Sequence, residues 1–230
     1  MAVIVISPHF DDAVLSAWTY LQSKEVSILT ICAGVPSAEV CVSSADLNCG
    51  FTSGREAALE RIHEDVRVCN GLGIVPIHLD ELDYPYSGDK DKTKLGKKLS
   101  PHIYPDNTIF VPLGIGRHPD HVATRDSVIQ MYKNNNSFQL FFYADFPYAS
   151  MPRYKRDKYN WLAIEKEIRS QGIQLCKFQK VSLEQEWIEK KIEYLKKYKS
   201  QIRMLQVNYP DLLNVPGILK NEYFWGATYD

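Results

Sequence analysis

Short, continuously apolar runs alternate along this chain with longer stretches in which apolar residues recur every three or four positions. The short runs predict five strands, at residues 2–6, 26–32, 74–79, 108–113 and 140–144. Their lack of polar alternation is typical of strands buried on both faces of a sheet. The periodic stretches predict helices at residues 12–22, 53–72 and 120–132. This alternation favours an α/β fold, with a single domain and a mainly parallel sheet flanked by helices.

The second helix carries clear end signals. Ser53 is a favourable N-cap and Gly73 a favourable stop. Its apolar spacing puts the inward face at Ala57, Ala58, Ile62 and Val66. Beyond the fifth strand, residues 176–181 are typical of an edge strand, and residues 183–205 of one long helix. Three polar segments are expected to be loops that shape specificity: residues 33–52, 80–106 and 149–161.

Two polar clusters follow the first and fourth strands. Residues 9–12 are His-Phe-Asp-Asp, and residues 118–121 are His-Pro-Asp-His. Open parallel sheets bind ligands at the carboxyl ends of their strands, where the strand order reverses. In the order 3-2-1-4-5, strands one and four lie side by side, so the clusters would face each other across one crevice. Each cluster alone also fits an ordinary helix start, because Asp and Pro are favoured there.

Imidazole and carboxylate groups at such positions make a metal site, an acid–base site or both. A catalytic metal takes three protein ligands and leaves a position for water. The clusters supply such a set in His9, Asp12 and His121. Asp11 is then the candidate general base, and His118 is the candidate that protonates the leaving group or stabilises an oxyanion. Asp120 is expected to fix the tautomer of a histidine through its ring N–H.

The composition bears on partners and location. Net charge is −1, from 27 basic and 28 acidic residues, which gives no long-range attraction to nucleic acid or an anionic membrane. The five cysteines lack metal-binding spacing and predict reduced thiols, with a Cys41–Cys49 disulfide as the alternative. The sequence shows neither a signal peptide nor an apolar stretch of membrane-spanning length, so we expect a soluble cytoplasmic protein. The oligomeric state does not follow from the sequence.

The two histidine motifs resemble those of the PIG-L/LmbE family of metal-dependent N-acetylglucosamine deacetylases. The motifs are Ser7–Asp12, followed by Val-Leu, and Gly116–His121. Supporting likenesses lie in Arg61 with Glu64, in the segment 143–148, and in the C-terminal residues 198–201 and 222–225. The resemblance implies a Rossmann-like, LmbE-like fold. It also implies hydrolysis of the acetamide of an amino sugar or glycoconjugate, a small-molecule substrate.

The resemblance also implies roles for individual residues. The metal ligands would be His9, Asp12 and His121, with Zn²⁺ as the expected metal and Fe²⁺ as the alternative. Asp11 would match the general base and His118 the residue that assists the tetrahedral intermediate or the leaving amine. Arg61 would match an arginine that contacts the sugar. Tyr148 is a further substrate-binding candidate, because an aromatic side chain in a loop can stack on a sugar.

Two positions depart from the family pattern. Phe10 replaces the usual Pro after the first His, and Ala13 replaces the usual Glu after the aspartate pair. Ala13 removes a carboxylate expected to support the metal ligands. This variant of the motif looks like a subgroup that includes deacetylases of glycosylated natural products.

Two alternatives from other classes fit the same residues. Two His and one carboxylate also form the facial triad of non-haem Fe(II) oxygenases. The absence of the usual Glu at Ala13 leaves room for a catalytically degenerate sugar-binding module. Oxygen consumption without acetate release would favour the first, and sugar binding without turnover would favour the second.

Overall fold

The computed structural model describes residues 2–150, 161–214 and 217–229. This part of the chain contains a seven-stranded sheet. The strands are β1 Val3–Ser7, β2 Val26–Thr30, β3 Pro76–His78, β4 Thr108–Pro112, β5 Gln139–Tyr143, β6 Ile173–Ser182 and β7 Asn221–Tyr229. Their spatial order is β3-β2-β1-β4-β5-β7-β6. The first five are parallel, and β7 and β6 add antiparallel strands. The predicted α/β fold and the order 3-2-1-4-5 are confirmed.

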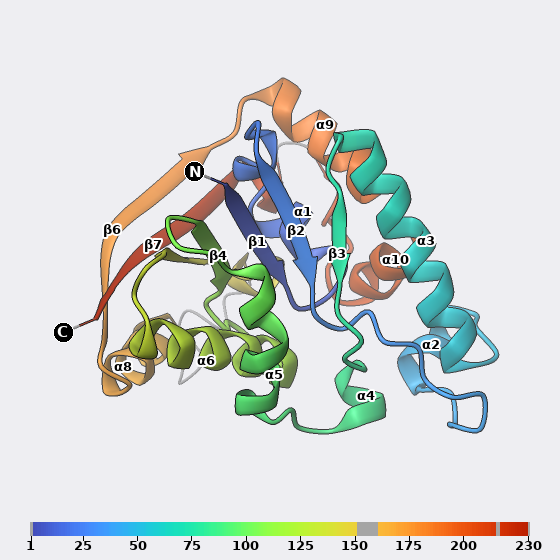
Figure 1. The fold of residues 1–230 in the computed structure, drawn as a ribbon. Helices are drawn as coiled ribbons and strands as arrows, with labels where there is room; N and C mark the ends of the chain where they lie inside the picture. Colours follow the sequence, from blue (N-terminus) through green and yellow to red (C-terminus); the bar gives the residue numbers. More distant parts are fainter. Residues whose placement is uncertain (1, 151–160, 215–216, 230) are drawn as a thin grey trace.

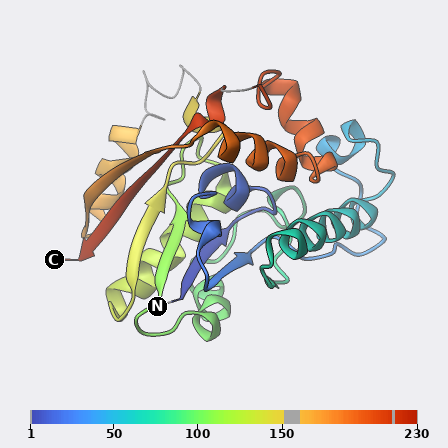
Figure 2. The same cartoon turned by 90° about the horizontal axis from the view of Figure 1, so that it is seen from above.

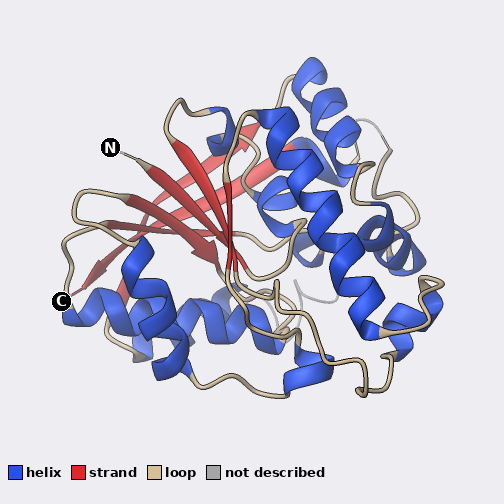
Figure 3. Ribbon diagram, turned by 45° about the vertical axis from the view of Figure 1, so that its right-hand side comes forward, coloured by secondary structure: helices blue, strands red, loops and turns tan. Residues whose placement is uncertain are grey.

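Helices cover both faces of the sheet (Figure 1). The α-helices are α1 Asp12–Ser16, α2 Ser44–Asn48, α3 Gly54–Leu72, α4 Tyr84–Ser87, α5 Lys92–Leu99, α6 Pro119–Asn134, α8 Trp161–Ser170, α9 Gln185–Leu195 and α10 Lys199–Asn208. Short 3-10 helices are η1 Tyr20–Gln22, η2 Ser100–His102, η3 Tyr148–Ser150 and η4 Ile218–Lys220. Figure 3 shows α3, α9 and α10 on one side, with α5, α6 and α8 on the other. Seen from above, β6 and β7 extend the sheet at the edge away from α3 (Figure 2).

The pairing of β1 with β4 determines where the two histidine clusters lie. The two strands run parallel, with Val3 opposite Thr108 and Val5 opposite Phe110. Their side chains are almost all buried, as continuous apolar strands covered on both faces require. Because parallel strands end at the same edge, the chain after β1 and the chain after β4 leave the sheet together.

The helix expected at residues 12–22 is interrupted. It divides into α1 and η1 because the Glu222 carboxylate, from β7, accepts hydrogen bonds from the backbone N–H groups of Trp18 at 2.8 Å and Thr19 at 3.0 Å. Lys191 of α9 donates to the same carboxylate at 2.8 Å, and both charged side chains are fully buried. Burial lowers the pKa of Lys191, although Glu222 opposes that shift. Trp18 is fully buried in the core.

The prediction of one helix at residues 183–205 is also wrong, because this segment forms two helices, α9 and α10. Glu64 of α3 accepts hydrogen bonds from the backbone N–H of Ser200 at 3.0 Å and from its hydroxyl at 2.6 Å. Tyr198, buried between the two helices, donates to Asp65 at 2.7 Å. A carboxylate at a helix start satisfies free N–H groups, so α3 fixes where α10 begins.

The ends of α3 are confirmed, but its inward face differs from the prediction. Ser53 accepts a hydrogen bond from the backbone N–H of Glu56, and Gly73 ends the helix with φ +71°. Ala57 is buried as expected, whereas Ala58, Ile62 and Val66 are only half-buried. The charged side chains Arg61, Glu64 and Asp65 are buried in their place. Apolar spacing therefore misplaced the face, because α3 buries charges that pair with groups elsewhere in the fold.

Some elements were missed. The polar segments 33–52 and 80–106 contain α2, α4 and α5, and strand β7 was recognised only as a C-terminal motif. The expected edge strand is confirmed as β6. Of the expected loop at 149–161, residues 151–160 lie outside the described part of the chain. All five cysteines are free thiols, including Cys41 and Cys49. Among the described residues, no helix has the length and apolar character needed to cross a bilayer.

Replacing Glu222 by Gln is expected to lower the free energy of unfolding by about 3–5 kcal/mol, because the Lys191 ammonium stays buried without its counter-charge. Urea denaturation followed by circular dichroism measures this change. The control Arg169→Met removes an exposed ion pair with Glu165 and is expected to change the free energy of unfolding by less than about 1 kcal/mol. Equal losses in both variants would contradict the role given to Glu222.

Candidate active site

The first cluster is shaped by the turn that leaves β1. The Ser7 hydroxyl donates to the carbonyl of His9 at 2.6 Å and accepts from the backbone N–H of Ala13 at 3.0 Å. The backbone N–H of His9 donates to Asp12 Oδ2 at 2.8 Å. These bonds close the chain on itself between strand and helix, so His9, Asp11 and Asp12 all lie at the carboxyl edge of the sheet.

The second cluster begins helix α6. Gly114 and Gly116 precede it at φ +85° and +88°, and a Cβ on Gly116 would lie 2.7 Å from the ring of Tyr148. Only glycine accommodates both the backbone angle and this close approach. His118 is the N-cap of α6, where its Nδ1 accepts from the backbone N–H of Asp120 at 3.3 Å. One turn further, His121 lies on the buried side of the helix.

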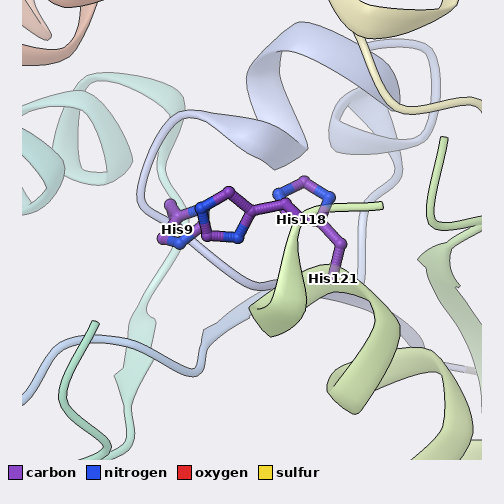
Figure 4. A group of neighbouring side chains, drawn as sticks. All are labelled: His9, His118 and His121. Atoms are coloured by element: carbon purple, nitrogen blue, oxygen red, sulfur yellow. The ribbon is translucent and has the colours of Figure 1, made fainter. Parts of the chain in front are cut away.

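The two clusters meet, as the strand order predicted. The ring centroid of His9 lies 4.8 Å from that of His118 and 5.2 Å from that of His121. Figure 4 shows the three imidazoles grouped between the loop after β1 and the start of α6. They line a pocket of about 130 Å³ that Asp11 and Asp12 also line. These five predicted residues therefore line one small cavity.

Asp12 lies close to one ring nitrogen of His9 and to one ring nitrogen of His121. Asp12 Oδ2 lies 3.4 Å from His9 Nδ1 and 3.3 Å from His121 Nε2. Tetrahedral coordination with bonds of about 2.0–2.1 Å separates neighbouring ligand atoms by about 3.3–3.5 Å. His121 Nε2 is buried and has no hydrogen-bond partner. A cation between the three side chains would use that nitrogen, so the residues present fit a metal.

A carboxylate lies behind the imidazole of His9 and another behind that of His121. Asp120 Oδ2 is 3.1 Å from His9 Nε2, and Asp145 Oδ1 is 2.6 Å from His121 Nδ1. Asp145 is further held by the backbone N–H groups of Gly114 and Ile115, each at 2.9 Å. Carboxylates that accept the second ring N–H fix the tautomer of a metal-binding histidine and raise its basicity. These two aspartates supply this support without a carboxylate at position 13.

Two overlapping groups of potential ligand atoms lie beside Asp12. His9, His118 and His121 form one, and His9, Asp83, His118 and Asp120 form the other; within each group the ligand atoms lie within 4.8 Å of one another. However, the buried ammonium of Lys90 forms a short ion pair with Asp120. A positive charge at that distance disfavours a cation on the Asp120 side of His9. The electrostatics therefore disfavour a cation in the group that contains Asp83 and Asp120.

The surrounding carboxylates favour positive charge at two of the histidines. Burial opposes protonation of both, but Asp83, Asp12 and Asp120 raise the pKa of His9 well above its usual value. Asp12 and Asp145 likewise outweigh burial and raise the pKa of His121 to about 9. Burial would raise the pKa of Asp12, yet His121 and His9 hold it well below its usual range. A metal cation can supply this positive charge once the ring nitrogens are deprotonated.

Asp11 and His118 differ in their acid–base properties. Burial, and then the charge of Asp12, raise the pKa of Asp11 to about 7. Burial, and then the positive charge of His9 and His121, lower the pKa of His118 to about 3. Because Nδ1 of His118 accepts a backbone hydrogen bond, the neutral ring carries its proton on Nε2. Asp11 can thus exchange protons near neutral pH, whereas His118 is a neutral hydrogen-bond donor.

The two predicted substrate contacts also border the pocket. Arg61 of α3 is buried and forms a short ion pair with Asp46 of α2. Tyr86 donates a short hydrogen bond to the same aspartate. Tyr148 lies across the pocket, with its ring 6.0 Å from that of His121. Arg61 therefore has an internal counter-charge before any ligand binds.

The sequence analysis gave no role to three charged residues around the site. Asp145 lies in the segment 143–148 that resembled the family, directly after β5, the strand next to β4, and that position was a signal for a role in the site. Lys90 and Asp46 lie in the segments expected to be loops, and the sequence gives no sign of their partners. Asp46 is 1% exposed and Asp145 is fully buried, so both are internal parts of the site.

The model of the PIG-L family, described as GlcNAc-PI de-N-acetylase, matches residues 4–132, more than half of the chain. No curated protein sequence matches. A deacetylase of the teicoplanin biosynthetic pathway, solved as a triple mutant, superposes with a TM-score of 0.79 at 23% identity and covers 100% of this chain and 99% of that one.

Two further proteins, and a second form of the teicoplanin enzyme, share the fold. The deacetylase Dbv21, which acts on the A40926 pseudoaglycone, superposes with a TM-score of 0.75 at 24% identity, covering 99% of this chain and 97% of its own. The N,N'-diacetylchitobiose deacetylase from Pyrococcus horikoshii gives 0.60 at 17% identity, covering 98% and 83%. A zinc-inhibited form of the teicoplanin enzyme, Orf2, gives 0.75 at 20% identity, covering 100% and 99%.

These similarities and the site agree. At such identities the solved structures establish the fold, and the family match identifies the lineage. The matched residues contain both histidine clusters, β1, β4 and the start of α6. The chain belongs to the PIG-L family, as its two histidine motifs indicated.

Proposed function

We propose that this protein is a metal-dependent hydrolase that removes the acetyl group from an N-acetylated amino sugar or its glycoconjugate and releases acetate. One observation carries the proposal: Asp12 Oδ2 lies 3.4 Å and 3.3 Å from a nitrogen of His9 and of His121, beside Asp11 and His118 in one pocket. These side chains combine a metal position, a proton acceptor and a hydrogen-bond donor.

The reaction class rests on family membership, because the matching family is one of de-N-acetylases. Structural relatives are described as deacetylases that act in teicoplanin biosynthesis, on the A40926 pseudoaglycone and on diacetylchitobiose. All three descriptions concern other proteins. They support a substrate in which the acetylated sugar is part of a larger molecule, and they offer no support for the oxygenase or the binding module.

We assign Zn²⁺ to His9, Asp12 and His121, with Fe²⁺ as the alternative, because two imidazoles and one carboxylate suit either ion. A cation held there supplies Lewis-acid chemistry, since it lowers the pKa of water and polarises a carbonyl. Asp120 and Asp145 keep the two histidines oriented through their second ring nitrogens. The zinc-inhibited form of a relative makes the zinc concentration a variable in any assay.

Asp11 is the proposed general base. In the hydrolysis, water adds to the acetyl carbonyl carbon and loses a proton, the C–N bond breaks, and the sugar amine gains a proton. With a pKa of about 7, Asp11 can accept the proton from water and return it to the amine. Its side chain is 5% exposed, so few waters compete for that proton.

His118 is the proposed stabiliser of the developing oxyanion. Its pKa of about 3 keeps the imidazole neutral, and its Nδ1 is engaged by the start of α6. Nε2–H is then available to donate a hydrogen bond where negative charge develops on the acetyl oxygen. Between the two roles predicted for His118, this arrangement favours oxyanion stabilisation over protonation of the amine.

Asp11→Asn is expected to reduce kcat for acetate release by at least about 100-fold, because the amide cannot accept a proton. Metal affinity should stay within a factor of a few, since Asp11 is not a proposed ligand. Acetate release from methyl N-acetylglucosaminide and metal content by atomic emission measure the two quantities. The control Asp89→Asn, at an exposed position, should keep wild-type kcat. Full activity in Asp11→Asn would refute the assignment of the base.

Asp145→Asn is expected to weaken metal binding about 10- to 100-fold, because a neutral amide supports the His121 imidazole less well. Competition with a chromophoric chelator gives the dissociation constant. Asp126→Asn is the matched control, since this α6 carboxylate pairs with Arg125 and Lys92. Unchanged affinity in Asp145→Asn would show that the carboxylate does not support the metal.

Chelation is expected to abolish acetate release, and stoichiometric Zn²⁺ or Fe²⁺ should restore it. Titrating each metal separately, while following acetate and oxygen together, identifies the effective ion. Oxygen consumption without acetate would favour the oxygenase, and sugar binding by the fully loaded protein without turnover would favour the binding module. Full activity in the metal-free protein would remove the basis of the proposal.

A further inference from the structure

A second, larger cavity lies beside the histidine pocket. Its volume is about 690 Å³, within the range of roughly 300–1,000 Å³ typical of ligand pockets. The described residues that line it are Ile115, Ala144, Phe146, Ala149, Ser150, Phe178, Gly217, Ile218, Asn221, Tyr223 and Trp225. None of these described residues is charged. Among its polar groups, the Ser150 hydroxyl donates to the carbonyl of Pro147, and the Asn221 side chain accepts from Ser182.

The wall of this cavity is one face of β7. Along that strand, Glu222 and Phe224 are buried in the core, whereas Tyr223 and Trp225 point the opposite way and are only partly buried. The neighbouring strand β6 has an irregular register between Cys176 and Gln179, and Phe178 lies within it. Such irregularities redirect side chains. Phe178 is 58% exposed, with its ring 5.3 Å from that of Trp225.

The aromatic rings form a row that leads toward the active site. The ring of Tyr223 lies 6.3 Å from that of Phe178 and 6.3 Å from that of Phe146, with interplanar angles of 15° and 10°. Phe146 also lines the histidine pocket. An apolar ligand resting on this row would be desolvated along its length, which is the main source of affinity that such a surface offers.

The cavity and the histidine pocket share one wall. Phe146 lines both, Tyr148 lines the histidine pocket, and Ala149 and Ser150 line the cavity. The two cavities therefore adjoin at Phe146, and a glycoconjugate with its acetylated sugar beside His121 would reach the second cavity by passing this side chain. The volumes fit this division, because the polar pocket of about 130 Å³ is much smaller than its apolar neighbour.

We propose that the second cavity is an aglycone cavity, which binds an extended apolar group attached to the amino sugar. The proposal rests on the proposed deacetylase function and specifies its substrate as an amphipathic glycoconjugate. The apolar group can be aliphatic or aromatic, since the row of rings presents hydrophobic surface to both. A phosphorylated aglycone would find no counter-charge among the described lining residues.

Methyl, octyl and naphthyl β-glycosides of N-acetylglucosamine test the proposal. We expect kcat/KM at least tenfold higher for the octyl or the naphthyl glycoside than for the methyl one, and the two arms distinguish aliphatic from aromatic aglycones. Phe178→Ser should reduce that ratio at least threefold. Tyr104→Ser is the matched control, because Tyr104 is 62% exposed and precedes β4 at the opposite end of the strand. Its ratio should equal that of the wild type.

Binding of the deacetylated products gives a test independent of turnover. Calorimetry with the methyl, octyl and naphthyl glycosides of glucosamine should show at least tenfold tighter binding of an apolar glycoside and a negative heat-capacity change. Phe178→Ser should reduce this difference and Tyr104→Ser should not. Equal affinities for the three glycosides, or an apolar preference unaffected by Phe178→Ser, would overturn the aglycone cavity. Preferential binding without acetate release would sustain the cavity and refute the deacetylase.

Discussion

Negative charge buried at the carboxyl edge of the sheet is the constraint around which the site is organised. Asp12, Asp120 and Asp145 are each at most 5% exposed and lie within hydrogen-bond or ion-pair distance of an imidazole. Buried carboxylates are costly unless positive charge lies beside them. Lys90 compensates Asp120, and the remaining negative charge lies beside His9 and His121. A cation bound there would therefore also balance the charge of the buried carboxylates.

The carboxyl edge of the sheet carries two kinds of surface. Charged and hydrogen-bonding groups gather where β1 and β4 end, whereas aromatic side chains gather where the sheet continues into β5, β7 and β6. The antiparallel extension therefore does more than widen the sheet. It supplies an uncharged, aromatic surface beside the pocket that holds the charged side chains.

Local sequence patterns predicted the parts of this molecule that depend on local causes. Continuous apolar runs gave the parallel strands, and the order of β1 and β4 followed from the general architecture of such sheets. The breaks after α1 and between α9 and α10 were missed because they depend on Glu222 and Glu64, residues distant in sequence that take over backbone hydrogen bonds. The roles of Asp145 and Lys90 were missed for the same reason, because residues that meet only in the folded protein leave no periodic pattern in the sequence.

The hydrogen bond between Trp18 and Glu222 joins residues 204 positions apart in the sequence, and this separation affects the order in which parts of the fold can form. The turn that bears Asp11 and Asp12 leads into α1, whose far end has its backbone groups satisfied by the last strand. During synthesis, the first segment of the active site would emerge long before the carboxylate that completes it. Contacts of such long range slow folding, because loop-closure entropy is paid before they form. The turn that holds Asp11 and Asp12 is therefore expected to reach its final structure only after β7 has joined the sheet.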